Sequence, residues 1–131
     1  MTNVAVLETP QVSNPYQLAT VDKAKAFIDQ NFSDQLSLSD IARHSNMSVF
    51  HFSRLFKKVT GYSPHQYLLY KRMDSAKDVL KDSELSITEA AHRTGFSSVE
   101  YFATVFRSQY GLNPTQYRRQ IKNSSGFQVL V

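Results

Sequence analysis

One module occurs twice in this sequence, and this repeat is the strongest constraint on its fold. Residues 36–48, LSLSDIARHSNMS, match residues 85–97, LSITEAAHRTGFS. After one inserted residue, HFSRLFKKVTGYSPHQY at 51–67 matches YFATVFRSQYGLNPTQY at 101–117. A repeat of this length indicates that both copies form the same supersecondary unit. We therefore expect two similar folding units within one chain.

The first copy carries start and stop signals for two short helices. Ser37 can cap a helix, and Asp40 follows at a position where the helix dipole favours a carboxylate. Asn46 tolerates the left-handed backbone of a tight turn. Ser48 can cap a second helix that ends at Gly61. Two short helices joined by a brief turn are typical of a helix-turn-helix.

The second copy repeats these signals. Ser86 with Glu89 has the spacing of a capping box, and so does Ser97 with Glu100. Gly95 stands at the turn, where its freedom to adopt a positive φ suits a tight connection. Because the helix start and turn signals of the first copy recur here, this copy is predicted to form a second helix-turn-helix.

A longer helix joins the two copies. Ser63 can cap it, and Pro64 suits its first turn, where a missing N–H costs nothing. The pattern predicts a helix over 64–81 with one buried stripe. The apolar residues of this stripe are Leu69, Met73, Ala76 and Leu80.

The remaining segments flank the repeat. A supporting helix is expected from a cap at Thr20 through Phe32, because apolar residues recur there at helical spacing. Residues 123–131 change from polar to apolar, which is compatible with a disordered end but favours a loosely bound tail. The expected organisation is a mobile N-terminal arm at 1–16, a first helix-turn-helix subdomain at 17–63, a linker helix at 64–81, a second subdomain at 82–122 and a C-terminal tail at 123–131.

Charge and composition restrict the class of protein. The chain has 131 residues, a formal net charge of +4 and no cysteine. A basic chain is compatible with nucleic acid or an anionic surface as its partner. The lack of cysteine excludes disulfides and suits a reducing compartment, and no apolar run has the length of a membrane span or signal peptide. We expect an all-α protein of the cytoplasm.

The helix expected at 49–60 has one face suited to nucleic acid. Phe50, Ser53 and Arg54 are candidates for base reading, because an arginine can fork to guanine and an aromatic edge can contact a thymine methyl. Lys57 and Lys58 are candidates for phosphate contacts. The opposite face supplies the predicted core residues Phe52, Leu55, Phe56 and Val59. A basic face on an isolated helix is usually an ordinary solvated surface, but its place in a repeated helix-turn-helix favours major-groove binding.

The equivalent helix at 98–110 presents a less basic face. Glu100 and Thr104 are its base-reading candidates, since a carboxylate can accept from cytosine N4, although capping is the preferred role of Glu100. Arg107 is a candidate for a phosphate contact. We expect this copy to make fewer base contacts and more backbone contacts than the first.

Further phosphate candidates lie where a helix begins after each copy. Ser63 and Asn113 start corresponding helices, and a helix N-terminus attracts anions through its free N–H groups and its dipole. Arg118 and Arg119 follow in the second of these helices. Either arginine is a candidate for a phosphate contact, with a solvated or intramolecular role as the alternative.

The sequence carries no pattern of an enzyme or a metal protein. Its histidines fall on different expected elements, without a ligand spacing or a nearby carboxylate cluster. There is no phosphate-binding loop and no nucleophile elbow. We expect no catalytic residue, metal or cofactor.

Taken together, these residues resemble the DNA-binding domain of AraC/XylS-type bacterial transcription regulators, from about Val21 to Arg119. The second copy matches the family signature through GF at 95–96, YF at 101–102, Phe106, Arg107, Gly111, Pro114, Tyr117 and Arg118. The first copy matches through Ile41, Ala42, Ser48, SRLFKK at 53–58, Gly61, Pro64 and Tyr67, and the joining helix through Arg72, Met73, Ala76 and Leu80. Thr104 departs from the pattern, because many members have arginine there.

The resemblance implies seven helices in which two helix-turn-helix units, held by one long helix, enter neighbouring major grooves. It also implies action at promoters, usually activation through contacts with RNA polymerase. The chain resembles small members of the family that consist of this domain alone and bind as monomers. Base reading by Phe50, Ser53 and Arg54 agrees with their positions in the family pattern.

A tandem repeat in one chain predicts a single molecule on an asymmetric site. We expect half-sites about one helical turn, or roughly 34 Å, apart, and one protein on a duplex of about 20 base pairs. The main alternative is a non-enzymatic adaptor that uses a degenerate helix-turn-helix scaffold to bind another regulator or polymerase. RNA is a weaker alternative, because its deep, narrow major groove does not readily admit a helix.

Overall fold

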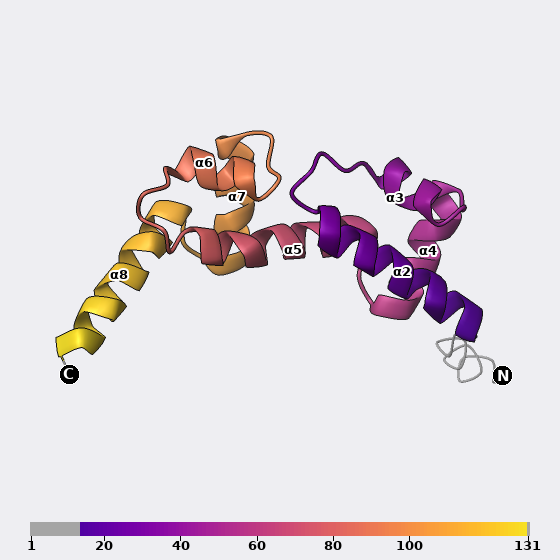
Figure 1. The fold of residues 1–131 in the computed structure, drawn as a ribbon, viewed down its shortest axis with the longest axis horizontal. Helices are drawn as coiled ribbons and strands as arrows, with labels where there is room; N and C mark the ends of the chain where they lie inside the picture. The colour runs from indigo at the N-terminus through magenta and orange to yellow at the C-terminus, as the bar shows by residue number, and fades with distance from the viewer. Residues whose placement is uncertain (1–13, 131) are drawn as a thin grey trace. The chain divides into compact units, whose positions relative to one another are not determined.

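The computed structural model describes residues 14–130, with side chains described for 14–123. These residues form seven α-helices and no strand (Figure 1), which confirms the expected all-α class and helix number. The helices are α2 (Pro15–Asn31), α3 (Leu38–His44), α4 (Val49–Thr60), α5 (Pro64–Val79), α6 (Ile87–Arg93), α7 (Val99–Tyr110) and α8 (Pro114–Leu130). Among the helices of the described residues, none has the length and apolar character needed to cross a bilayer.

The chain divides into two compact units, and the division runs through α5. The described part of the first unit comprises residues 14–31 and 36–69, and that of the second comprises 32–35 and 70–130. Each unit contains one helix-turn-helix, α3 with α4 or α6 with α7. Helix α5, which we expected as a separate linker, is therefore shared by the two units. Residues 32–35, in the connection before α3, belong to the second unit.

In the first unit, α2, α3 and α4 contact one another around a small apolar core. Its buried side chains are Val21, Ala24 and Ile28 from α2, Ile41 and Ala42 from α3, Phe52 and Phe56 from α4, and Leu68 from α5. Burying a phenylalanine of this kind stabilises the fold by about 1.5–3 kcal/mol. Leu55 and Val59, which we also expected in this core, are half-buried, as is Leu69 of the predicted α5 stripe.

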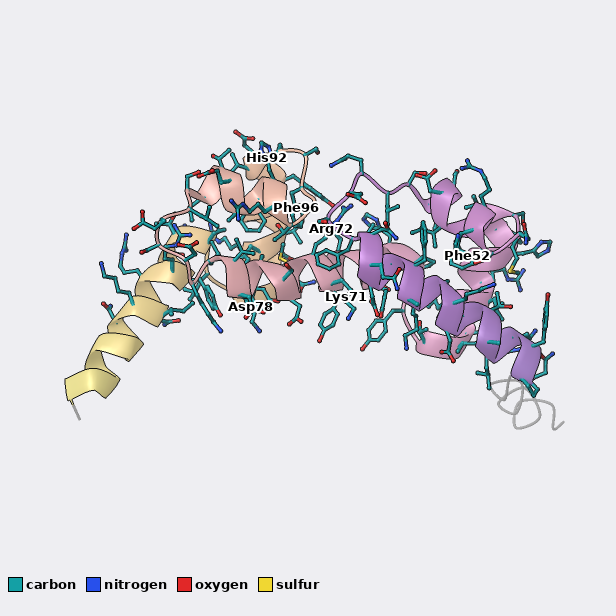
Figure 2. The ribbon with its side chains drawn as sticks, viewed as in Figure 1. Phe52, Lys71, Arg72, Asp78, His92 and Phe96 are labelled. Atoms are coloured by element: carbon teal, nitrogen blue, oxygen red, sulfur yellow. The ribbon has the colours of Figure 1, made fainter. Side chains whose placement is uncertain are left out.

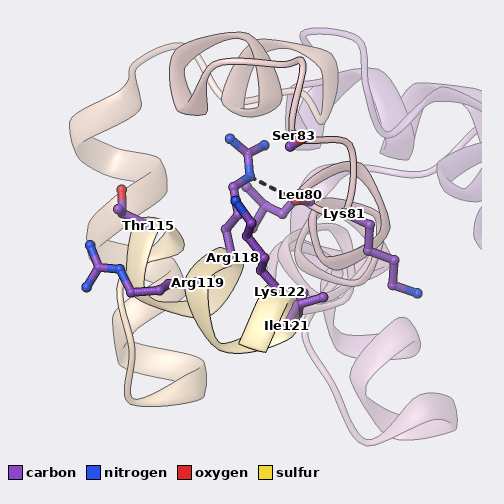
Figure 3. A pocket seen from close by; sticks show the side chains of 8 residues that line it. All are labelled: Leu80, Lys81, Ser83, Thr115, Arg118, Arg119, Ile121 and Lys122. Carbon is purple, nitrogen blue, oxygen red and sulfur yellow. Dashed lines mark hydrogen bonds between the residues drawn. The ribbon is translucent and has the colours of Figure 1, made fainter. Parts of the chain in front are cut away.

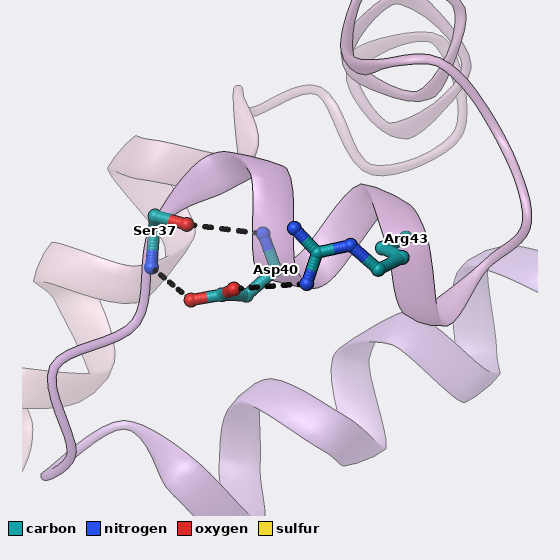
Figure 4. A network of polar contacts seen from close by, with 3 residues as sticks. All are labelled: Ser37, Asp40 and Arg43. Atoms are coloured by element: carbon teal, nitrogen blue, oxygen red, sulfur yellow. Dashed lines mark hydrogen bonds and ion pairs between the residues drawn. The ribbon is translucent and has the colours of Figure 1, made fainter.

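The predicted helix signals of the first copy are present in the structure. The Ser37 hydroxyl accepts from the Asp40 backbone N–H at 3.0 Å, and the Asp40 carboxylate accepts from the Ser37 N–H at 3.0 Å (Figure 4). The backbone hydrogen bond from Ser37 is the main cause of a lowered Asp40 pKa, and Arg43 acts in the same direction. Ser48 caps α4, and Gly61 ends it in the left-handed conformation. The turn between α3 and α4 places Asn46 at φ 57°.

In the second unit, α7 contacts both α6 and α8. The buried aromatic residues Phe96, Phe102 and Phe106 form a continuous series of ring contacts at 5.2 and 5.8 Å between centroids. The expected box of Ser86 with Glu89 caps α6. The prediction that Ser97 and Glu100 form a capping box is wrong, because Ser98 is the residue that caps α7. Ser98 has the extended backbone of a cap, and its hydroxyl accepts from the Tyr101 N–H.

Gly95 lies at a close backbone approach in the second unit. Its φ is +99°, and a Cβ there would lie 2.5 Å from the Phe32 carbonyl oxygen and 2.6 Å from Arg72 Nε. Arg72 is buried and donates from Nε to Phe32 O at 2.7 Å and from Nη2 to Asp34 O at 2.8 Å. Its guanidinium also lies near the Phe96 ring, 5.9 Å from the centroid (Figure 2). Residues 32–35 are therefore integral to the packing of the second helix-turn-helix.

Both flanking expectations need correction where the structure describes them. Helix α2 begins at Pro15 rather than after Thr20, because Asn14 and Gln17 form reciprocal hydrogen bonds at its start. The Thr20 hydroxyl instead donates to the Tyr16 carbonyl. The expected arm thus ends before residue 15, and its residues 1–13 lie outside the described part. At the other end, the backbone of 123–130 continues α8 instead of leaving it as a separate tail.

Candidate nucleic-acid interface

The first turns of α4 present an aromatic residue and a guanidinium together. Phe50 is 64% exposed, and the Arg54 guanidinium carbon lies 5.3 Å from its ring centroid. The two residues are one helical turn apart, and Arg54 is also exposed. A cation placed over an aromatic face is stabilised by about 0.5–1 kcal/mol at an exposed site. This contact limits the orientations of a side chain that could otherwise move freely.

The local structure of α4 fixes which residues face outward. Phe52 and Phe56 are fully buried, so the helix cannot rotate without exposing them. At its start, the Ser48 hydroxyl accepts from the His51 N–H and lies 3.0 Å from His51 Nδ1. Ser53 is half-buried, and Lys57 and Lys58 are exposed in the last turn. All the residues predicted for this face therefore lie on the solvated side or at its edge.

The corresponding face of α7 has different chemistry. Glu100, Thr104 and Arg107 are exposed, as expected. The Thr104 hydroxyl donates to the Glu100 carbonyl at 3.0 Å, so its proton is already used within the helix and its oxygen remains as an acceptor. The Glu100 carboxylate is not used in a capping box. This face can accept from a base edge, but only Arg107, near the end of the helix, supplies a strong donor.

At the starts of α5 and α8, side chains accept hydrogen bonds from backbone N–H groups that we expected to be free for a phosphate. The Gln66 backbone N–H donates to Ser63 Oγ at 3.1 Å, while Gln66 Oε1 accepts from the Ser63 N–H at 2.9 Å. Asn113 and Gln116 make the same pair of bonds at the start of α8. Because the first helical residue is proline in both cases, few free N–H groups remain for a phosphate.

Arg118 and Arg119 have different environments. Arg118 donates from Nε to Leu80 O at 2.9 Å, from Nη1 to Leu85 O at 2.7 Å and from Nη2 to Asp82 O at 3.1 Å. Its guanidinium thus holds the connection between α5 and α6, which corrects its expected place on a phosphate-binding surface. Arg119 is exposed and remains compatible with a phosphate contact.

Sequence reasoning missed two kinds of residue around this site. The glutamines that close the starts of α5 and α8 follow a serine and an asparagine at capping-box spacing, so a search for that pattern would have found them. Arg72 matches the family pattern, but its role had no comparable signal, because its partners are backbone carbonyls distant in the sequence. Among the side chains that the structure describes, no three histidine or acidic residues come together as a metal site.

The comparisons with known proteins agree with this geometry. A family model described as a helix-turn-helix domain matches residues 41–120. A solved AraC-type regulator from Chromobacterium violaceum is 29% identical, with a TM-score of 0.71, over 82% of this chain and 96% of that one. The chain belongs to the AraC-type helix-turn-helix family. The matched part begins within α3 and includes the whole of α4, α5, α6 and α7.

Two further relatives of this AraC-type chain are informative. The DNA-binding domain of AdpA, solved in complex with a target DNA, is 30% identical with a TM-score of 0.76 and shares 79% of this chain and 94% of that chain. The regulatory protein PocR of Salmonella typhimurium is 42% identical over 103 residues, which are 79% of this chain and 34% of PocR. The chain thus spans about a third of the length of this curated relative.

Proposed function

We propose that this protein is a sequence-specific transcription regulator that binds double-stranded promoter DNA through both helix-turn-helix units. The observation that carries the proposal is the exposed Phe50–Arg54 contact on the solvated face of α4. A planar guanidinium with two parallel N–H donors matches guanine O6 and N7, and the neighbouring ring can contact a thymine methyl. Support also comes from the similarity to a DNA-binding domain solved with its target.

In this proposal α4 and α7 make different kinds of contact with the DNA. Phe50, Ser53 and Arg54 of α4 read bases, and Lys57 and Lys58 contact phosphates. In α7, Glu100 and Thr104 act as acceptors toward bases, and Arg107 contacts the backbone. Ser63, Asn113 and Arg119 add phosphate contacts; Arg118 is omitted because its donors hold backbone carbonyls.

The tandem repeat supports binding of one chain to one asymmetric site. We propose half-sites about one helical turn apart on a duplex of about 20 base pairs. The decisive experiment is selection of bound fragments from random duplexes, followed by titration of the selected duplex and measurement of the mass of the complex. One protein per duplex, on a site without two-fold symmetry, is the expected result. Two proteins per duplex on a palindrome would contradict binding as a monomer.

The family supports activation as the regulatory outcome, with RNA polymerase as the protein partner and the cytoplasm as the compartment. An in vitro transcription assay on a promoter that carries the selected site tests this part separately. Added protein is expected to raise the number of transcripts. A decrease, with binding intact, would assign repression instead and leave the DNA-binding proposal unaffected.

The alternative is an adaptor that binds another regulator or polymerase without DNA. The exposed Phe50 ring favours it, because exposed aromatic residues are common anchors of protein interfaces. The largely apolar end at 127–131 also favours an adaptor, but its side chains lie outside the described part. Tight association with polymerase, combined with no measurable duplex affinity at low salt, would favour the adaptor over the DNA-binding protein.

A further inference from the structure

A basic pocket lies within the second unit, between the end of α5, the connection to α6 and helix α8 (Figure 3). Its volume is about 490 Å³. Small-molecule sites in proteins typically occupy about 300–1,000 Å³. The pocket lining includes two apolar residues, Leu80 and Ile121, and four cationic ones, Lys81, Arg118, Arg119 and Lys122. No acidic residue lines it.

The cations around this pocket are held to different degrees. Arg118 is fixed by three backbone carbonyls, so its positive charge is a rigid part of the wall. Lys81 makes an exposed ion pair with Asp78 at 3.3 Å, one helical turn away. Arg119 and Lys122 make no ion pair with any residue whose side chain is described. Like charges that gather around one cavity repel each other, and a bound anion relieves this repulsion.

The pocket also offers an apolar surface. Leu80 is fully buried beneath the lining, so the accessible apolar surface comes from the half-buried Ile121. The aliphatic stems of long cationic side chains add apolar surface while their charged ends reach water. An inorganic anion would use the charges alone, whereas a ligand with an apolar body would use both parts of the lining.

We propose that this pocket binds a small organic anion, a carboxylate or phosphate monoester attached to an aromatic or aliphatic body. The charged head lies between Lys122 and Arg118, which keeps two N–H groups beyond those bonded to carbonyls, and the body lies against Ile121. The Arg119 guanidinium points away from Arg118 (Figure 3). This site lies outside the faces of α4 and α7, and neither Arg118 nor Lys122 is among the proposed DNA contacts; of the lining, Arg119 alone is. It gives the regulator a place to bind a metabolite within its DNA-binding region.

The test is a titration of the full chain, labelled with ¹⁵N, followed through its backbone amide resonances. The probes are benzoate and phenyl phosphate, with benzamide as the neutral control of the same shape. Either anion is expected to produce saturable shifts confined to residues near 80–83 and 115–122, and benzamide is not. Shifts that do not saturate, shifts spread over both units, or equal shifts with benzamide would overturn the proposal.

Two exposed variants and one control sharpen this test. Lys122→Gln removes one charge-assisted hydrogen bond and is expected to weaken binding of the anion about tenfold, whereas Arg119→Gln, whose guanidinium points away from Arg118, should weaken it less than about twofold. Lys23→Gln, an exposed change in the first unit, should leave it unchanged. Unchanged affinity in Lys122→Gln would contradict the site. Displacement of the anion by a short random duplex would assign these cations to the DNA backbone, which also overturns the proposal.

Discussion

The recognition helices α4 and α7 have the same fold but different surfaces. Each is capped by a serine, ends at a left-handed glycine and buries two phenylalanines. The repeat pairs Phe50 with Glu100 and Arg54 with Thr104. A paired ring and guanidinium in one copy therefore correspond to a carboxylate and an internally bonded hydroxyl in the other. The two copies therefore share the residues that build the helix and differ in those on the exposed face that we propose for DNA binding.

The turn glycine of the second copy, which takes the place of Asn46 in the first, should show the largest effect of any single substitution. Gly95→Ala is expected to lower the free energy of unfolding by about 3–5 kcal/mol, because it combines a positive φ with a clash against the Phe32 carbonyl. Gly111→Ala is the matched control, since its φ is +78° but no atom lies within 4 Å of the added Cβ, and it should cost about 1–2 kcal/mol. Urea unfolding measures both. Equal losses would contradict the close approach at Gly95.

The neighbouring arginines of α8 should separate stability from binding. Arg118→Gln is expected to lower the free energy of unfolding by about 2–4 kcal/mol, because buried carbonyls lose a charged donor. Arg119→Gln, on the exposed side, should change it by less than about 0.5 kcal/mol. The same urea measurement applies. If Arg118→Gln instead left stability unchanged and reduced only DNA affinity, its original assignment to phosphate would be restored.

The difference in base reading is tested by paired substitutions at equivalent positions. Arg54→Ala is expected to weaken binding to the selected duplex by about 1–3 kcal/mol and to relax preference at one base. Thr104→Ala should cost less, about 0.5–1.5 kcal/mol, because its hydroxyl proton is already used within α7 and only one neutral acceptor is lost. Fluorescence anisotropy with selected and random duplexes of equal length compares them. An equal loss on both duplexes for Arg54→Ala would remove it from the base-reading set.

The smallest expected effect is one that the two helices share. Lys57 and Arg107 occupy equivalent positions and are both exposed. Lys57→Gln and Arg107→Gln should each reduce the slope of log affinity against log salt by about 0.9, if each residue contacts one phosphate. Titrations at several salt concentrations measure this slope. A change in base preference, without a change in slope, would show that the replaced residue reads bases instead.

The sequence predicted the repeated elements well because their signals are local. Caps such as Ser37, Ser48 and Ser86 act on residues within one turn, so spacing alone identified them. Two adjacent serines before α7 were a harder case, since either could cap and the backbone conformation decided for Ser98. The Asn14–Gln17 pair that starts α2 had a readable spacing and was overlooked.

The candidate site was predictable in its outline and less so in its details. Helical periodicity separated the solvated face of α4 from its buried face, which placed Phe50 and Arg54 correctly on the exposed side. It could not separate Arg118 from Arg119, because the acceptors of Arg118 are backbone carbonyls of a connection far away in the sequence. Backbone acceptors have no residue type, so no motif reveals them.

Residues 32–35, in the connection between α2 and α3, have a practical consequence for anyone recombining members of this family. They are covalently part of the first half of the chain, yet Arg72 and Gly95 make them structural members of the second unit. A chimera joined within α5 would therefore combine this segment from one parent with its docking surface from another. An exchange that keeps the second unit intact therefore requires that residues 32–35 come from the same parent as the residues after position 69.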